Sequence, residues 1–137
     1  MQKKAQFKNG YTFNRVINGC WQLSAEHCLQ GHLDYDDAIR AFHELVEQGF
    51  TTFDCADIYT GVEDFFGGII RERRKAGLRL PQIHTKFVPD LNDLANVTPA
   101  YIENIITRSL RRLGVERLDA VQFHWWDYSV PGMVDVA

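Results

Sequence analysis

The sequence has no apolar run long enough to cross a membrane. Its longest near-apolar stretch, Phe65 to Ile70, has two glycines among six residues, whereas a membrane-spanning helix needs roughly 18 residues. An excess of basic residues is also absent, because 15 Lys and Arg stand against 18 Asp and Glu, for a formal net charge of −3. No broad basic face is therefore available to hold nucleic acid. We expect neither a membrane nor a nucleic acid as a partner.

Features of an exported protein are missing as well. The charged start, Met1 to Lys4, is followed by the polar stretch Ala5 to Asn9 rather than by the apolar region of a signal peptide. The three cysteines form no CxxC pair, and an odd number cannot be fully joined in disulfides. This cysteine usage favours a reducing compartment. We therefore expect a cytoplasmic protein.

A metal site is not predicted. Two cysteines and two histidines gather near the start of the chain: Cys20, His27, Cys28 and His32. Their spacing matches no zinc-binding pattern. We expect the protein to hold no metal ion.

The sequence does contain the composition of one globular domain and a regular alternation of strands and helices. Of its 137 residues, 45% are apolar and 24% are charged, as in an ordinary folded domain. The Asn9–Gly10 pair, flanked by Phe7 and Phe13, predicts a short β-hairpin at the start. Four β-prone runs follow, over residues 16–19, 51–54, 82–86 and 118–123.

Helical segments separate these runs. An apolar stripe from Ala38 to Val46 has the spacing of one helix face, in a helix that begins near Asp36. Residues 63–76 form a second helical segment. A third begins at Thr98–Pro99, where a capping threonine precedes a proline that needs no N–H donor. Pro131 marks the start of a fourth helix, which we expect to be truncated at the end of the sequence.

The repeat of strand and helix predicts the fold class. The predicted strands end 35, 32 and 38 residues apart, at Gly19, Asp54, Lys86 and His124. This is the rhythm of βα units with a parallel sheet. An open doubly wound sheet is less favoured, because segment 19–24 lacks the GxGxxG turn. Since eight such units take roughly 250 residues in a (β/α)8 TIM barrel, we predict an α/β fold in which residues 1–137 form a single half barrel of four βα units.

Ionisable side chains stand at the ends of three predicted strands: Asp54, Lys86 and His124. In a βα barrel the C-terminal ends of the strands meet at one mouth, where active sites are built. A carboxylate, an ammonium and an imidazole are costly to place in one partly buried rim unless they pair. Each residue alone has a simple structural explanation, but the three together predict an active site.

Motifs around these residues resemble the aldo-keto reductase family. The segment FDCADIY, Phe53 to Tyr59, is similar to the family's Asp-x-Ala-x-x-Tyr motif, and His84 to Lys86 is similar to its Thr-Lys strand. Gln122 to Trp125 resembles the strand that ends in the family's active-site histidine, and Ser109 to Gly114 resembles the segment before it. The resemblance extends from about Tyr11 to Pro131 and implies the N-terminal half of that family's barrel.

The resemblance implies reduction of aldehydes and ketones to alcohols, with NADP(H) or NAD(H) as cofactor. Four residues match the family's catalytic tetrad: Asp54, Tyr59, Lys86 and His124. Tyr59 would donate a proton, which a nearby ammonium makes easier to release. We therefore expect its hydroxyl within about 5 Å of the Lys86 ammonium. Asp54 would hold Lys86 by a charge-assisted hydrogen bond, and His124 would orient the carbonyl group.

The resemblance also implies sites for the cofactor and for a small carbonyl substrate. The expected cofactor contacts are Gly19, Cys20, Trp21 and Asp54. The family's main cofactor-binding residues belong to later strands, which are not part of this sequence. The expected substrate pocket, in which aromatic rings exclude water, is formed by Trp21, Tyr59, Trp125 and Trp126.

Two other functions stay open. The half barrel could be a non-catalytic part of an assembly, or Lys86 could form a Schiff base, as in class I aldolases. In every case we expect a partner that covers the inner face of the sheet, either a second copy in a homodimer or the missing C-terminal half. Five apolar residues are assigned to that face: Ile17, Phe53, Ile83, Val121 and Phe123. Leaving such side chains in water costs roughly 1.5–3 kcal/mol each.

Overall fold

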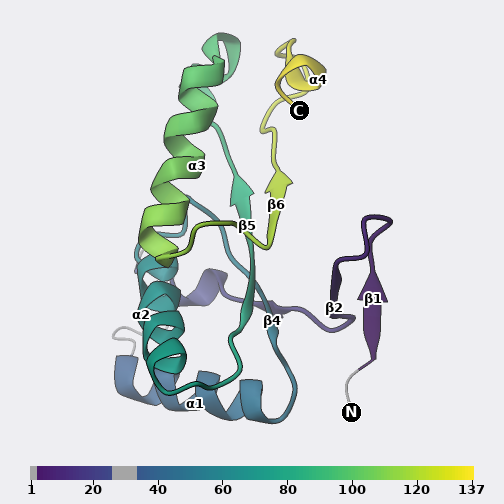
Figure 1. Ribbon diagram of the computed structural model, residues 1–137. Coiled ribbons are helices and arrows are strands. Elements are labelled where there is room, and N and C mark those ends of the chain that lie inside the picture. Colours follow the sequence, from purple (N-terminus) through teal and green to yellow (C-terminus); the bar gives the residue numbers. More distant parts are fainter. Residues whose placement is uncertain (1–2, 26–33) are drawn as a thin grey trace.

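The computed structural model describes residues 3–25 and 34–137. Figure 1 shows a central sheet with helices along one side and a separate two-stranded hairpin on the other. The hairpin pairs β1 (Lys4–Gln6) with β2 (Thr12–Asn14) in antiparallel register. Gly10 in the turn has a φ of 89°, which a residue without a side chain adopts freely. The predicted hairpin is confirmed.

The central sheet has four parallel strands in the order β3-β4-β5-β6. Their ranges are Asn18–Gly19 for β3, Thr52–Asp54 for β4, Gln82–Phe87 for β5 and Ala120–Phe123 for β6. Helical structure follows each strand along the chain, so the predicted βα organisation is confirmed. β3 is shorter than predicted, because pairing with β4 begins only at Asn18.

Three long helices follow β3, β4 and β5: α1 (Tyr35–Glu47), α2 (Val62–Lys75) and α3 (Pro99–Leu113). Thr98 caps α3 by accepting the Tyr101 N–H, and Gly114 ends it with a φ of 64°. The final helix α4 (Met133–Val136) begins two residues after Pro131, and two short 3-10 helices, η1 (Trp21–Leu23) and η2 (Leu91–Asn96), were not predicted. Among the helices of the described residues, none is both long and apolar enough to span a membrane.

The hydrophobic core lies between the helices and the sheet. Its members are at most 7% exposed and include Phe42, Phe53, Phe66, Ile69 and Ile83. Phe53 and Ile83 are register partners on β4 and β5. The ring of Phe53 packs against Phe42 of α1 with centroids 4.7 Å apart. The prediction that Phe53 and Ile83 lie on the inner face is therefore wrong.

The correction follows from the alternation of side chains along a strand. Asp54 and Lys86 point away from the helices, so the residues before them, Phe53 and Thr85, point toward the helices. The Thr85 hydroxyl contacts Glu63 of α2 at 2.7 Å, in agreement with this orientation. Near Asp54 and Lys86, the inner face of the sheet is consequently polar rather than apolar.

The same alternation corrects the assignment of Phe123. Phe123 and Phe87 are register partners, and their rings stack with centroids 5.7 Å apart. Since Phe87 contacts Tyr101 of α3, Phe123 also lies on the helix side. Val121 is the register partner of Thr85, so its side chain also points to the helix side. Of the five apolar residues assigned to the inner face, Ile17 and Val121 are the exposed ones, at 39% and 43%. The uncovered apolar surface is smaller than predicted.

Candidate active site

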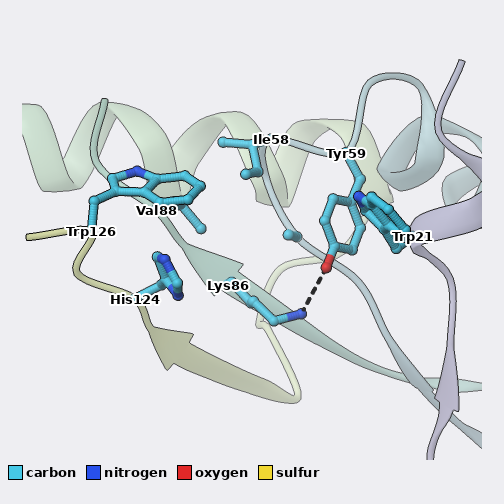
Figure 2. A pocket seen from close by; sticks show the side chains of 8 residues that line it. Trp21, Ile58, Tyr59, Lys86, Val88, His124 and Trp126 are labelled. Atoms are coloured by element: carbon cyan, nitrogen blue, oxygen red, sulfur yellow. Dashed lines mark hydrogen bonds between the residues drawn. The ribbon is translucent and has the colours of Figure 1, made fainter. Parts of the chain in front are cut away.

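Three partners surround the ammonium group of Lys86, which lies near the C-terminal end of β5. Its Nζ donates to Asp54 Oδ2 at 2.6 Å, to the main-chain oxygen of Cys55 at 2.8 Å and to Tyr59 Oη at 3.4 Å. Figure 2 shows the Tyr59 hydroxyl turned toward this nitrogen. The distance expected between these two groups is confirmed.

Asp54, at the end of β4, is held by both of the strands that follow it. Lys86 of β5 donates to Oδ2, and Gln122 Nε2 of β6 donates to Oδ1 at 2.8 Å. With both oxygens engaged, the carboxylate fixes the Lys86 side chain in one place. Gln122 lies in the motif that ends at Trp125, but it was not predicted as a site residue. The available signal is its position two residues before His124, on the same face of its strand.

His124 follows β6 and faces the cavity drawn in Figure 2. Its main-chain N–H donates to the Phe87 oxygen at 3.0 Å, which extends the ladder between β5 and β6. The ring of Trp126 stands edge-on to the imidazole, with centroids 4.6 Å apart. Trp126 is itself held, because its Nε1 donates to the Pro89 oxygen at 2.9 Å. The imidazole therefore has a fixed neighbour on one side.

The cavity has a volume of about 460 Å³ and one polar wall. Tyr59, Lys86 and His124 form that wall. The complete lining consists of Trp21, Ala56, Ile58, Tyr59, Lys86, Val88, His124 and Trp126. Asp54 does not line this cavity: it contacts Lys86 and borders a neighbouring cavity. A carbonyl compound in the cavity would face a phenol, an ammonium and an imidazole inside largely apolar walls.

Two of the three predicted tryptophans line the cavity. Trp21, in η1, and Trp126 lie on its walls. Trp125 does not, because it is 4% exposed and its Nε1 donates to the Val130 oxygen at 3.3 Å. Consecutive residues after a strand point to opposite sides, so Trp125 packs against Phe123. Its prediction as a pocket residue is wrong.

The four residues predicted to contact a cofactor do not share one environment. Gly19 and Asp54 border one cavity, and Trp21 borders the other. Cys20 is 2% exposed and packs in the hydrophobic core, where burial raises the pKa of its thiol to about 12. The Cys20 side chain is therefore out of reach of a cofactor, contrary to the prediction. Its main-chain N–H donates to the main-chain oxygen of Asp54 at 3.0 Å.

The lining of the two cavities suits a flat ring such as nicotinamide better than it suits phosphate groups. A Cβ at Gly19 would meet no atom within 4 Å, so this position leaves open space. Trp21 and Tyr59 offer flat ring surfaces nearby. Lys86 is the one cation among the described residues that line the cavity of Figure 2, and it already donates to three acceptors. That wall therefore offers no free cation to a pyrophosphate.

Among the residues that the structure describes, no group of three or more His, Cys, Asp or Glu side chains could hold a metal ion. Of the four cysteine and histidine residues considered above, Cys20 lies in the core. The other three, His27, Cys28 and His32, lie outside the described residues. The expectation for them stays a prediction.

Comparisons with known proteins show what this arrangement is similar to. The sequence model of the aldo/keto reductase family matches residues 15–137. The aldo-keto reductase AKR2E5 of the silkworm Bombyx mori is similar in structure, with a TM-score of 0.71 and 24% identity, over 91% of this chain and 37% of its own. The structure of AKR2E5 complexed with NADPH has a TM-score of 0.72 and 23% identity, over 91% of this chain and 36% of its own.

A further solved structure agrees in fold. The aldose reductase from Schistosoma japonicum has a TM-score of 0.65 and 19% identity, over 90% of this chain and 36% of its own. The chain thus spans little more than a third of the length of these structures. With its hairpin, parallel strands and connecting helices, the chain belongs to the aldo/keto reductase family and forms half of an α/β TIM barrel.

Proposed function

We propose that this chain provides the proton-donating half of an oxidoreductase that reduces aldehydes or ketones with a nicotinamide cofactor. Membership of the aldo/keto reductase family supports an oxidoreductase role. The observation that carries the proposal is the 3.4 Å contact between Lys86 Nζ and Tyr59 Oη, on the wall of a cavity that His124 also lines.

In this proposal Tyr59 donates its proton to the carbonyl oxygen of the substrate. The phenol O–H bond breaks, the proton bonds to that oxygen, and a phenolate remains 3.4 Å from the Lys86 ammonium. The positive charge stabilises the phenolate and so makes the proton easier to release. Asp54 and the main-chain oxygen of Cys55 keep the ammonium in place during this step.

His124 and the apolar walls orient the substrate. The imidazole lies on the same wall as Tyr59 and Lys86, where a hydrogen bond from it to the carbonyl oxygen polarises the carbonyl group. Trp21 and Trp126 supply ring surfaces on other parts of the lining. Such walls favour an aldehyde or ketone with an aromatic or other apolar substituent.

A bound nicotinamide group, from NADP(H) or NAD(H), supplies the hydride that the carbonyl carbon receives. In this chain the candidate contacts for its ring are Gly19, Trp21 and Asp54, which border the two neighbouring cavities. Lys86 is committed to its three acceptors. We therefore propose that polypeptide outside this chain binds the phosphates.

The same additional polypeptide would complete the barrel wall. In the described residues β3 and β6 each have one neighbouring strand, so each leaves one edge unpaired. A second copy of this chain or the other half of a longer polypeptide would cover these edges. In sedimentation equilibrium at micromolar concentration, a dimer supports the second copy, and a monomer that binds an apolar-surface dye supports the other half. A compact monomer that binds no dye contradicts both.

A Schiff-base role for Lys86 is the main catalytic alternative. A lysine that attacks a carbonyl needs a neutral amine with a free electron pair, whereas Lys86 donates to Asp54, Cys55 and Tyr59. We therefore expect borohydride, added together with an aromatic aldehyde, to leave no covalent adduct on Lys86 in peptide mass mapping. The exposed Lys75 of α2 is the control, because any adduct found on it measures unspecific alkylation of surface lysines. Selective, stoichiometric labelling of Lys86 would contradict the proposed role.

A non-catalytic half barrel is the second alternative. If the half barrel is non-catalytic, the completed assembly forms no alcohol from an aldehyde and reduced cofactor. This holds even though the assembly contains the four residues Asp54, Tyr59, Lys86 and His124. Equal amounts of alcohol formed and cofactor oxidised, measured in the same reaction, would exclude it. An assembly that binds reduced cofactor without turnover would establish it in place of the proposed function.

A further inference from the structure

A second ionic cluster lies on the helix side of the sheet, near the candidate active site. Two acidic residues in it are almost fully buried: Asp57 is 3% exposed and Glu63 is 1% exposed. Two arginines of α3 pair with them. Arg108 Nη2 lies 3.2 Å from Asp57 Oδ2, and Arg112 Nη1 lies 3.3 Å from Glu63 Oε2. The mechanism proposed above uses none of these four residues.

Asp57 joins the segment that carries Tyr59 to the strand that carries Lys86. Its Oδ1 accepts the main-chain N–H of Val88 at 3.1 Å, and its own N–H donates to the main-chain oxygen of Lys86 at 3.4 Å. Asp57 stands two residues before Tyr59, and Val88 stands two residues after Lys86 and lines the cavity. The position of Asp57 therefore affects both groups that form the contact between phenol and ammonium.

α3 holds the same segment from the other side. Arg108 pairs with the Asp57 carboxylate, and Arg112 Nη1 donates to the Asp57 main-chain oxygen at 2.9 Å. Arg112 also contacts Glu63, which accepts the Thr85 hydroxyl at 2.7 Å. Thr85 directly precedes the active-site lysine in sequence. The cluster thus contacts the chain both before Lys86, at Thr85, and after it, at Val88.

We propose that Asp57 is a positioning residue, which in its ionised form, paired with Arg108, holds the Tyr59 hydroxyl at its distance from the Lys86 ammonium. Its effect on turnover rests on the function proposed above, whereas the structural link does not. Arg108 Nε is buried and has no hydrogen-bond partner among the described residues. The side chain of Arg108 is 39% exposed, so once Asp57 loses its charge the guanidinium can turn to solvent.

The charge of Asp57 changes in an accessible pH range. Burial raises the pKa of its carboxyl from 3.8 to about 6, the charge of Glu63 adds to this rise, and Arg108 opposes it. As the pH falls through about 6, Asp57 takes up a proton and its attraction for Arg108 weakens. The ionisable groups that face Asp57 are Glu63 of α2 and Arg108, Arg112 and Tyr101 of α3.

The experiment follows the Tyr59 ring by NMR in a chain labelled with ¹³C-tyrosine, with the signal assigned by its loss in Tyr59→Phe. A His124→Gln background removes the imidazole of the cavity, because imidazoles ordinarily change charge in the same pH range. Between about pH 5 and about pH 8, we expect the Tyr59 signal to shift with a midpoint of about 6. In Asp57→Asn, which keeps the oxygen that accepts the Val88 N–H, this shift should disappear.

Two further variants in the same background keep the test decisive. Asp64→Asn is the matched control, because Asp64 lies 4.0 Å from Arg112 but its side chain is 67% exposed. In this variant the dependence of the Tyr59 signal on pH should equal that of the parent. Arg108→Gln removes a cation that lowers the pKa of Asp57, so the midpoint should move above 6. This variant applies even if Asp57→Asn does not fold. A Tyr59 signal that does not shift in the parent, or that shifts equally without Asp57, overturns the proposal.

Turnover provides a separate readout in the completed enzyme. Asp57→Asn should lower kcat roughly tenfold to a hundredfold with little change in KM, as expected when reacting groups are misplaced by about 1 Å. An unchanged kcat overturns the positioning role. The NMR shifts do not depend on turnover, so their presence in a protein that reduces no carbonyl would reject the proposed function and retain the link between Asp57 and Tyr59.

Discussion

Replacing Tyr59 with phenylalanine is expected to lower the rate of carbonyl reduction at least about a hundredfold, the usual contribution of a general acid. The change removes the O–H that donates the proton and keeps the ring that lines the cavity. Lys86 and Asp54 stay paired at 2.6 Å, because their contact does not involve the phenol. Steady-state kinetics with NADPH and an aromatic aldehyde, on the protein in its completed assembly, measure the effect.

Tyr128→Phe is the matched control for this experiment. Tyr128 is 79% exposed, so loss of its hydroxyl should leave the rate unchanged. Cofactor affinity should be the same in the Tyr59 variant and the parent, since the ring of Tyr59 is retained. If the Tyr59 variant kept the parent's rate, the proton would have to come from another group, and the assignment of Tyr59 as the acid would be wrong.

Two adjacent glycines in α2 are expected to respond in opposite ways to alanine. A Cβ at Gly67 would overlap the main-chain oxygen of Arg112, because α2 and α3 pack with their backbones close together. A Cβ at Gly68 would have Arg71 Nη2 as its nearest neighbour, at 4.0 Å. Gly67→Ala should lower the free energy of unfolding by about 1–3 kcal/mol or more. Gly68→Ala should raise it by up to about 1 kcal/mol, through helix propensity.

Urea unfolding followed by circular dichroism measures both changes in the chain as it stands. The pair is its own control, since the two substitutions add the same methyl group to neighbouring positions of one helix. The result also tests the packing that places the ionic cluster, because Gly67 lies against the main chain of Arg112, a member of that cluster. Equal unfolding midpoints for the two variants would contradict the close packing of α2 and α3.

Local sequence patterns were sufficient to predict the elements that depend on them. The apolar spacing from Ala38 to Val46 predicted α1, and the Thr98–Pro99 pair predicted the start of α3. The Asn9–Gly10 pair predicted the hairpin. Each of these signals acts over a few residues and needs no knowledge of the tertiary structure.

Predicting which face of the sheet a strand side chain points to requires the alternation of side chains along the strand. Apolarity alone places Phe53 and Ile83 on the inner face of the sheet. Their odd spacing from Asp54 and Lys86 places them on the opposite face, where both are almost fully buried. The same reasoning separates Trp125 from its neighbours on either side. The polar residues at the strand ends therefore predict the faces better than hydrophobicity does.

The cluster around Asp57 could not be predicted from local patterns. Arg108 is 51 residues from Asp57 and Arg112 is 49 residues from Glu63. Glu63 of α2 meets Arg112 where α2 and α3 pack against each other, and Arg108 of α3 meets Asp57 in the segment between β4 and α2. In the sequence, Asp57 is a variable position of the Asp-x-Ala-x-x-Tyr pattern between Asp54 and Tyr59. Its burial arises only when the chain folds, so the sequence does not reveal it.

The most direct test of the proposed carbonyl reduction uses NADPH in which both hydrogens on the reactive carbon of the nicotinamide ring are replaced by deuterium. The completed assembly is incubated with this cofactor and an aromatic aldehyde, and the product is examined by mass spectrometry. We predict an alcohol that carries one deuterium on its carbinol carbon, formed far more slowly when Tyr59 is replaced with phenylalanine. Alcohol without deuterium, or no alcohol from an assembly that binds NADPH, would contradict the function proposed for this site.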